Sequence, residues 1–181
     1  MSALDRLAVG EMRSVLVVQG EHRVTGESDV LLTTLLGSCI ATCLHDPVAK
    51  VGGMNHFLVA DGGSSSVGAE RYGLYAMEVL INGLLKLGGD KRRLQAKVFG
   101  GAAMTTTMGQ IGAANISFAR DFLKTEKINI VAEDVGGRIA RRVRYCPSTG
   151  RASLLHVENS ADPDLTVSRR PKIPPTDVTL F

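Results

Sequence analysis

The order of short apolar runs along this chain constrains its fold more than any other feature. Most runs have the length of β-strands and end at glycine, proline or polar turn residues, whereas only two stretches repeat their apolar residues at helical spacing. Strands come first, followed by a helix, a strand, a second helix and further strands. This order predicts a mixed α/β fold with antiparallel hairpins, and it differs from the regular alternation of a doubly wound parallel sheet.

The predicted strands are short, and several are joined by tight turns. Residues 30–36 are almost continuously apolar, which is typical of a buried strand. Residues 40–44 alternate between two faces, and the turn signal His45-Asp46-Pro47 leads into a returning strand at 51–60. The other strands are expected at 15–19 on a sheet edge, 94–99, 128–132, 139–146 and 151–157, with a loop at 21–29.

Two segments have the periodicity of amphipathic helices. In residues 72–87 the apolar side chains fall at steps of three and one along a single stripe, and a second helix is expected at 109–124. The chain has no tryptophan and only 4% aromatic residues, so its core must be built mainly from aliphatic side chains and methionine. The inner stripe of the first helix consists of Leu74, Met77, Leu80, Ile81, Leu84 and Leu85.

Length and composition predict one folded domain. The 181 residues, 44% of them hydrophobic, are enough for one well-buried core, which we assign to residues 1–159. Residues 61–66 are expected to form a flexible surface loop, and the Pro-rich segment 160–181 a loosely ordered tail.

The net charge of +3 is too small to indicate nucleic-acid binding, which we do not expect. Basic residues do cluster at 91–93 and at 138–144. Such clusters are most often solvated surface charge, and docking to an acidic protein surface is the alternative.

The cysteine content and the N-terminal segment favour a cytoplasmic protein. Three cysteines do not suggest a disulfide framework, and residues 1–13 are too charged for a signal peptide. No apolar run reaches the length of a membrane span, so no direct membrane insertion is expected.

The strongest chemical candidate is the turn Gly37-Ser38-Cys39, followed seventeen residues later by His56. A cysteine presented at a tight turn can attack a carbonyl carbon if a nearby histidine activates its thiol, and its own backbone N–H can stabilise the resulting oxyanion. A third group must orient the imidazole. Thr33 and Thr34 lie on the preceding strand, and only one of them can face the site because side chains alternate.

An inert, buried cysteine is the ordinary alternative to a nucleophile. We interpret Cys43 and Cys146 in that way. Cysteine and histidine spacings typical of metal sites are missing from the sequence, so no metal or other cofactor is expected.

Around these residues the sequence resembles the CheD family of chemoreceptor glutamine deamidases. The resemblance covers about Val9 to about Val157, and several separated motifs occur in the family's order. The chain departs from the pattern at Arg138 and Ile139, where a polar residue followed by arginine is expected. The matching motifs are residues 36–44, Asp46-Pro47, residues 52–57, residues 99–104, Ile111-Gly112 with Asn115, and residues 132–137 with Arg141.

The resemblance implies a layered α/β sandwich with sheets between helices, similar to glutamine-deamidating toxins. It implies hydrolysis of selected glutamine side chains in methyl-accepting chemotaxis receptors through a cysteine thioester, with release of ammonia and without a cofactor. By motif position the catalytic residues are Cys39, His56 and Thr33, and Ser38 or Asn55 could assist the oxyanion.

Two alternatives to this function remain open at the level of sequence. The family can pair with a CheC-type phosphatase of the chemotaxis response regulator, so the chain could be a regulatory binding module without catalysis. The same cysteine chemistry would also serve a protease or a transglutaminase, because the acceptor is chosen by pocket shape.

Overall fold

The computed structural model describes residues 12–59, 66–157 and 178–181. Most of the predicted loop at 61–66 and most of the predicted tail at 160–181 lie outside these ranges. Helix α1 spans Ser66–Lys86 and α2 spans Thr106–Thr125, with a short 3-10 helix at Lys91–Arg93. The strands are β1 Arg13–Leu16, β2 His22–Thr25, β3 Val30–Leu36, β4 Ile40–Asp46, β5 Val51–Phe57, β6 Gln95–Gly100, β7 Asn129–Val135, β8 Ala140–Cys146, β9 Arg151–Val157 and β10 Val178–Leu180.

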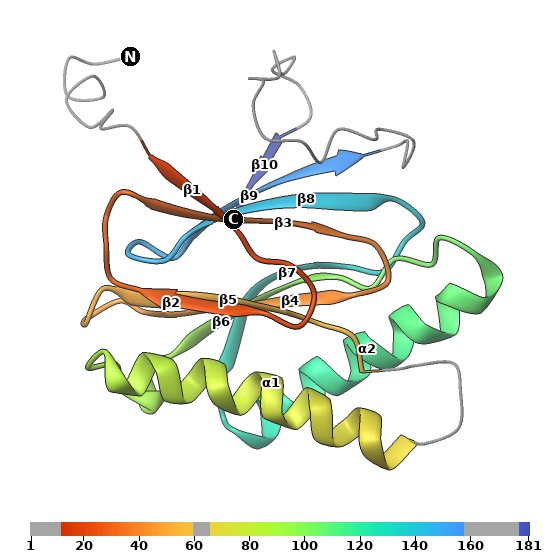
Figure 1. Cartoon of the computed structure of the whole chain (residues 1–181), viewed down its shortest axis with the longest axis horizontal. Helices are drawn as coiled ribbons and strands as arrows, with labels where there is room; N and C mark the ends of the chain where they lie inside the picture. Colours follow the sequence, from red (N-terminus) through yellow and green to blue (C-terminus); the bar gives the residue numbers. More distant parts are fainter. Residues whose placement is uncertain (1–11, 60–65, 158–177) are drawn as a thin grey trace.

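The strands form two stacked sheets (Figure 1). Sheet A has the order β1-β3-β8-β9-β10, and sheet B has the order β2-β5-β4-β6-β7. Only the β1–β3 and β6–β7 pairs are parallel, and the other neighbours are antiparallel. The predicted mixed, largely antiparallel α/β class is therefore confirmed, including the hairpins β4–β5 and β8–β9.

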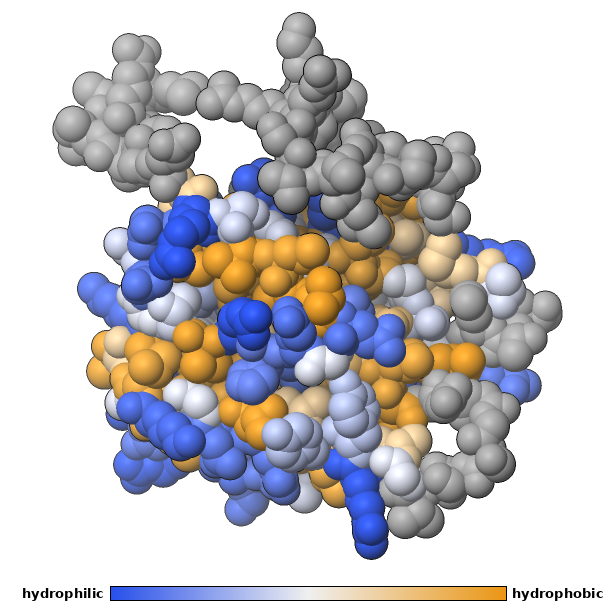
Figure 2. Space-filling model, in the orientation of Figure 1, coloured by the Kyte–Doolittle hydropathy of each residue, from blue (hydrophilic) through white to orange (hydrophobic). Residues whose placement is uncertain are grey.

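The molecule has three layers, in the sequence sheet A, sheet B and helices (Figure 1). Both α1 and α2 pack on sheet B, and sheet A has no helix on its outer face within the described ranges. The resemblance implied sheets between helices, whereas in the described ranges the helices cover sheet B alone. Leu35 of β3 and Leu16 of β1 are exposed. Figure 2 views the two sheets edge-on, and hydrophobic residues gather there at the level of sheet A.

The central strands of sheet B are buried on both faces, and all seven residues of β4 and all seven of β5 are buried. Ile40 and Leu44 point into the core shared with the helices. Ala41 and Cys43 point into the core shared with sheet A. The strand before the Cys39 turn, β3, also contributes to this second core, so the turn joins two strands whose inner faces pack against each other.

The sequence missed two features of the fold. The predicted loop at 21–29 contains strand β2, whose side chains are only partly buried but whose backbone pairs with β5. At the other end of the chain, β10 pairs with β9 and Phe181 packs against Phe99 with ring centroids 5.5 Å apart. The last residues of the predicted tail therefore belong to sheet A.

Candidate active site

Neighbouring elements fix the backbone of the Cys39 turn at three successive carbonyl groups. The Gly37 carbonyl accepts from the Ala102 N–H at 2.8 Å, and the Cys39 carbonyl accepts from the Gly101 N–H at 2.8 Å. Between them, the Ser38 carbonyl accepts from Asn115 Nδ2 at 2.9 Å. With its carbonyls engaged on one side, the turn is well placed to direct its N–H groups to the other side.

The glycines after β6 are required by this close approach. Gly100 has φ of +112°, and a Cβ atom there would lie only 2.1 Å from the Cys39 carbonyl oxygen. The turn and the Gly100-Gly101 step therefore contact each other through backbone atoms, as expected where glycine permits close packing.

The Cys39 side chain is half-buried and packs against the core between the two sheets. Burial raises the pKa of the Cys39 thiol, and a hydrogen bond from its own backbone N–H opposes this shift only in part. The N–H thus lies beside the sulfur, which the predicted role as an oxyanion donor would require. A raised pKa favours the protonated thiol, and a thiol needs a base to become the reactive thiolate.

His56 lies on β5 and faces sheet A, on the same side of sheet B as Cys39. It pairs with Ala41, which is two residues from Cys39 on the neighbouring strand. Residues in such a diagonal position are about 7–8 Å apart at the backbone, which is within reach of long side chains. The sheet register therefore brings the predicted cysteine and histidine to one location.

Two oxygens hold the Nδ1 atom of His56. Thr34 Oγ1 lies 2.9 Å away and the Val17 carbonyl oxygen 3.3 Å away. The Thr34 hydroxyl donates to that same Val17 carbonyl at 2.8 Å. The Val17 carbonyl can only accept, and the Thr34 hydroxyl already donates its proton to that carbonyl. Both oxygens can therefore only accept from Nδ1, which favours a proton on this ring nitrogen.

The other ring nitrogen of His56, Nε2, is then unprotonated and carries a lone pair. It is buried and has no hydrogen-bond partner among the described residues. Burial lowers the pKa of His56, although the Val17 carbonyl acts in the opposite direction. A neutral imidazole with a free Nε2 is the state that a general base requires.

Thr34, rather than Thr33, makes the orienting contact to His56. Thr34 is buried on the inner face of β3, whereas Thr33 is the preceding residue of the strand and its side chain points to the opposite face. Thr33 contributes near the site through its backbone, because its carbonyl accepts a hydrogen bond from the Val17 N–H at 2.9 Å. The assignment of the orienting role to Thr33 is therefore corrected.

Asn55 is directed away from the cysteine. Its Oδ1 accepts from the Thr42 N–H at 3.0 Å, and its Nδ2 donates to the Ala76 carbonyl of α1 at 3.0 Å. It ties sheet B to the helix layer and does not reach the Cys39 side of the sheet, so its predicted part in the oxyanion site is also corrected. Ser38 does lie in the turn, where its carbonyl is held by Asn115.

Sequence reasoning missed two contributors to the site. Asn115 of α2 fixes the turn and also accepts from the Val59 N–H at 2.7 Å, and its only signal was its place in a family motif. Gln19 places its side-chain Oε1 3.4 Å from Cys39 Sγ, and no pattern in the sequence singled it out.

The other two cysteines differ from Cys39 and from each other. Burial raises the pKa of Cys43 far above its usual range, which agrees with its interpretation as an inert residue. Burial also acts to raise the pKa of Cys146, but hydrogen bonds from Ser148 and Thr149 outweigh that effect and lower it. Cys146 is thus a more acidic thiol than predicted, although no histidine is hydrogen-bonded to it within the described ranges.

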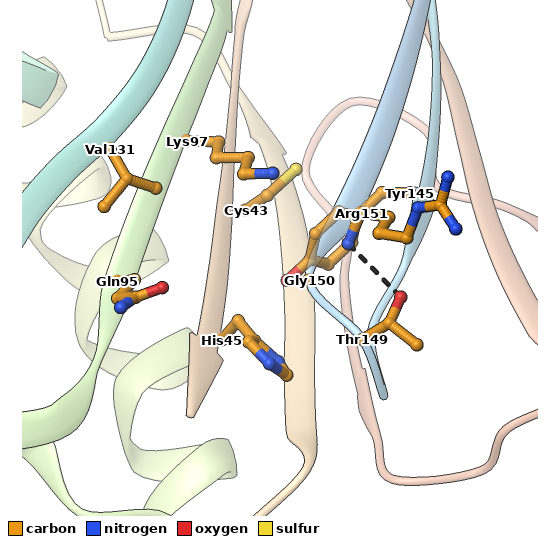
Figure 3. A pocket seen from close by; sticks show the side chains of 9 residues that line it. All are labelled: Cys43, His45, Gln95, Lys97, Val131, Tyr145, Thr149, Gly150 and Arg151. Carbon is orange, nitrogen blue, oxygen red and sulfur yellow. Dashed lines mark hydrogen bonds between the residues drawn. The ribbon is translucent and has the colours of Figure 1, made fainter. Parts of the chain in front are cut away.

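A separate cavity of about 160 Å³ lies between sheet B and the β8–β9 hairpin (Figure 3). It is lined by Cys43 and His45 of β4, by Lys97 of β6 and by Arg151 of β9, among others. His45 is held by a hydrogen bond between its Nδ1 and the Pro147 carbonyl at 2.9 Å. Neither Cys39 nor His56 lines this cavity, so it is not the location of the candidate chemistry.

Comparison with known proteins identifies the family. The model of the family described as CheD chemotactic sensory transduction matches residues 59–156. A protein of Zymomonas mobilis named "Probable chemoreceptor glutamine deamidase CheD" is 47% identical over 181 residues, covering 97% of both chains. This chain belongs to the CheD family.

Further relatives carry the same name. A protein of Caulobacter vibrioides, also named "Probable chemoreceptor glutamine deamidase CheD", is 49% identical over 177 residues, covering 92% of both chains. Among solved structures, the Neisseria meningitidis protein NMB0706 is 12% identical with a TM-score of 0.46, covering 75% of this chain and 68% of that one. None of the helices in the described ranges is long and apolar enough to cross a membrane.

Proposed function

We propose that this chain is a chemoreceptor glutamine deamidase that hydrolyses glutamine side-chain amides to glutamate and ammonia. The observation that carries the proposal is the His56 imidazole, fixed through Nδ1 by Thr34 with Nε2 left without a partner, on the same sheet face as the Cys39 thiol. The names of relatives that align over nearly the whole chain support the same activity.

In the first half-reaction, His56 Nε2 accepts the Cys39 thiol proton as the sulfur attacks the carboxamide carbon of a receptor glutamine. The C–S bond forms, and the carbonyl oxygen becomes an oxyanion beside the Cys39 N–H. The oxyanion then collapses, the C–N bond breaks, and His56 gives its proton to the departing ammonia. A thioester between Cys39 and the glutamyl side chain remains.

In the second half-reaction, His56 is again neutral and accepts a proton from a water molecule that attacks the thioester carbon. The C–S bond breaks, glutamate is released, and the proton returns to the Cys39 sulfur. Thr34 touches neither reactant and acts as a positioning residue, because it holds the imidazole in the tautomer that serves both steps.

A receptor cytoplasmic fragment incubated with the protein tests this proposal. Peptide mass spectrometry should find a gain of about one mass unit at particular glutamines with the wild type and none with Cys39→Ala. Cys43→Ala is the matched control, because Cys43 lies on the adjacent strand β4 facing the same core but has a pKa raised far out of the reactive range.

The possible outcomes separate the candidate functions. Shorter receptor fragments would indicate a protease instead. An unmodified receptor that is nevertheless bound by folded protein would overturn catalysis and favour the regulatory module that binds a CheC-type phosphatase.

A further inference from the structure

The Cys39 thiol already has a carboxamide beside it in the resting protein. Cys39 Sγ donates a hydrogen bond to Gln19 Oε1 at 3.4 Å. Gln19 is the same residue type as the substrate in the function proposed above, on which this inference rests. Its side chain therefore brings the group that the thiol attacks into contact with the attacking atom.

Anchored backbone on both sides holds Gln19 in this position. It lies in the connection between β1 of sheet A and β2 of sheet B, which crosses from one sheet to the other beside His56. Val17 is fully buried, and its N–H donates to the Thr33 carbonyl at 2.9 Å. On the other side, the Gly20 N–H donates to the His56 carbonyl at 2.8 Å, and the His56 N–H donates to the Glu21 carbonyl at 3.0 Å.

Gly20 allows the chain to turn immediately after Gln19. Its φ of +89° lies in the left-handed region that favours glycine. The Gln19 side chain itself is exposed to solvent, so it can leave the sulfur without breaking these backbone hydrogen bonds.

Occupation by Gln19 and attack on a substrate exclude each other. While the thiol proton is shared with Gln19 Oε1, it is not being passed to His56 Nε2. A receptor glutamine must also place its carboxamide carbon against the same sulfur, in the space beside Gln19 Oε1. A thiol is a weak hydrogen-bond donor, so the contact is easily exchanged.

We propose that Gln19 is an intramolecular pseudosubstrate, which occupies the carboxamide subsite of Cys39 and competes with the receptor glutamine. Occupation reduces the fraction of molecules ready to bind substrate and raises the apparent dissociation constant by the same factor. If Gln19 occupies the subsite about 70–90% of the time, its removal should improve apparent substrate affinity roughly 3- to 10-fold.

The test compares Gln19→Ala, Gln19→Glu and the wild type on the receptor fragment. Gln19→Ala should lower KM by about 3- to 10-fold with kcat changed less than about twofold, because only the competitor is lost. Gln19→Glu should instead lower kcat, since a carboxylate beside the sulfur raises the thiol pKa further. Gln95→Ala, an exposed glutamine at the start of β6, is the matched control and should behave as the wild type.

Alkylation of Cys39 by iodoacetamide gives a second readout that does not need the receptor. Iodoacetamide itself carries a primary carboxamide, and peptide mapping separates Cys39 from Cys146. The Cys39 rate should rise several-fold in Gln19→Ala while the Cys146 rate stays constant.

The two proposals fail in different ways. An unchanged KM together with an unchanged Cys39 alkylation rate in Gln19→Ala overturns the pseudosubstrate while the receptor is still deamidated. A faster Cys39 alkylation without any receptor deamidation supports the occupation by Gln19 and overturns the proposed deamidase function.

Discussion

Asn55 and His56 are neighbours on β5, and they represent the two faces of sheet B. Asn55 points to the helices, and both ends of its amide are hydrogen-bonded. His56 points to sheet A, and only its Nδ1 is bonded while Nε2 has no partner among the described residues. Asn55 therefore uses its buried amide to join elements, whereas His56 leaves one buried ring nitrogen available.

The largest effect is expected from removing that available nitrogen. His56→Asn can keep a donor near the position of Nδ1, and thus the contact to Thr34, but it has no equivalent of Nε2. Loss of a positioned general base should reduce kcat about 10²–10⁴-fold, measured as ammonia release or by receptor mass spectrometry. His45→Asn is the matched control, because His45 is also buried on sheet B and bonded through Nδ1.

If His45→Asn lost as much activity as His56→Asn, the effect would reflect disturbance of sheet B and not loss of a base.

The next largest effect is a loss of stability, expected from a substitution in the core between sheet B and the helices. Leu80 of α1 is fully buried in the core between the helices and sheet B, like Met77, Ile81 and Leu84 of the predicted inner stripe, whereas the placement of Leu74 and Leu85 on that stripe was wrong because both are exposed. Leu80→Asp would bury an unpaired charge and should lower the free energy of unfolding by about 3–4 kcal/mol, measured by urea denaturation. Tyr75→Asp, at a position on the same helix that is 64% exposed, should change it by less than about 0.5 kcal/mol.

Equal losses of stability in Leu80→Asp and Tyr75→Asp would contradict the register of α1.

A smaller effect separates the two threonines of β3. Thr34→Val removes the acceptor that fixes the His56 tautomer and should lower kcat about 10-fold, roughly 1.4 kcal/mol in activation free energy. Thr33→Val, on the opposite face, should leave kcat within about twofold of the wild type. Thr34→Ser restores the hydroxyl and should recover most of the loss, which a purely structural role of the methyl group would not predict.

If Thr33→Val lowered kcat more than Thr34→Val did, Thr33, the residue that the family motif indicated, would be the one that orients His56.

The smallest effect concerns pH. Burial lowers the pKa of His56, so the acidic limb of the kcat/KM profile should fall below the ordinary histidine value of about 6.5. The unfolded chain binds a proton at His56 below about pH 6.5 while the folded chain does not until lower pH. Stability from this residue is therefore complete above that pH and is lost as the pH falls through the interval below it.

In His56→Asn that part of the pH dependence of unfolding should disappear. A wild-type acidic limb at or above the ordinary histidine value would contradict a buried, neutral base.

Most strands and both helices could be predicted from the sequence, because apolar periodicity is a local signal, and the tight-turn motif singled out Cys39 and His56 as candidates. The choice between Thr33 and Thr34 could not be made in that way. Adjacent residues of a strand face opposite sides, and family spacing did not determine the face in this chain. Only the observed packing of β3 against β5 shows which threonine meets the imidazole.

Features that depend on long-range backbone pairing were also outside the reach of sequence patterns. Strand β2 is polar and lies at the edge of sheet B, so its formation depends on hydrogen bonds to β5 rather than on burial of its side chains. Gln19 lies in a polar connection, and its importance arises only because that connection crosses between the sheets beside Cys39.

The raised pKa of the Cys39 thiol has a consequence for how readily this cysteine is oxidised. Peroxides oxidise thiolates much faster than thiols, so the raised pKa slows oxidation of the Cys39 sulfur when no substrate is bound. Cys146, with its lowered pKa, is the cysteine that an oxidant should reach first. Under oxidative stress the protein should therefore acquire sulfenic acid at Cys146, near the β8–β9 hairpin, before Cys39 is oxidised.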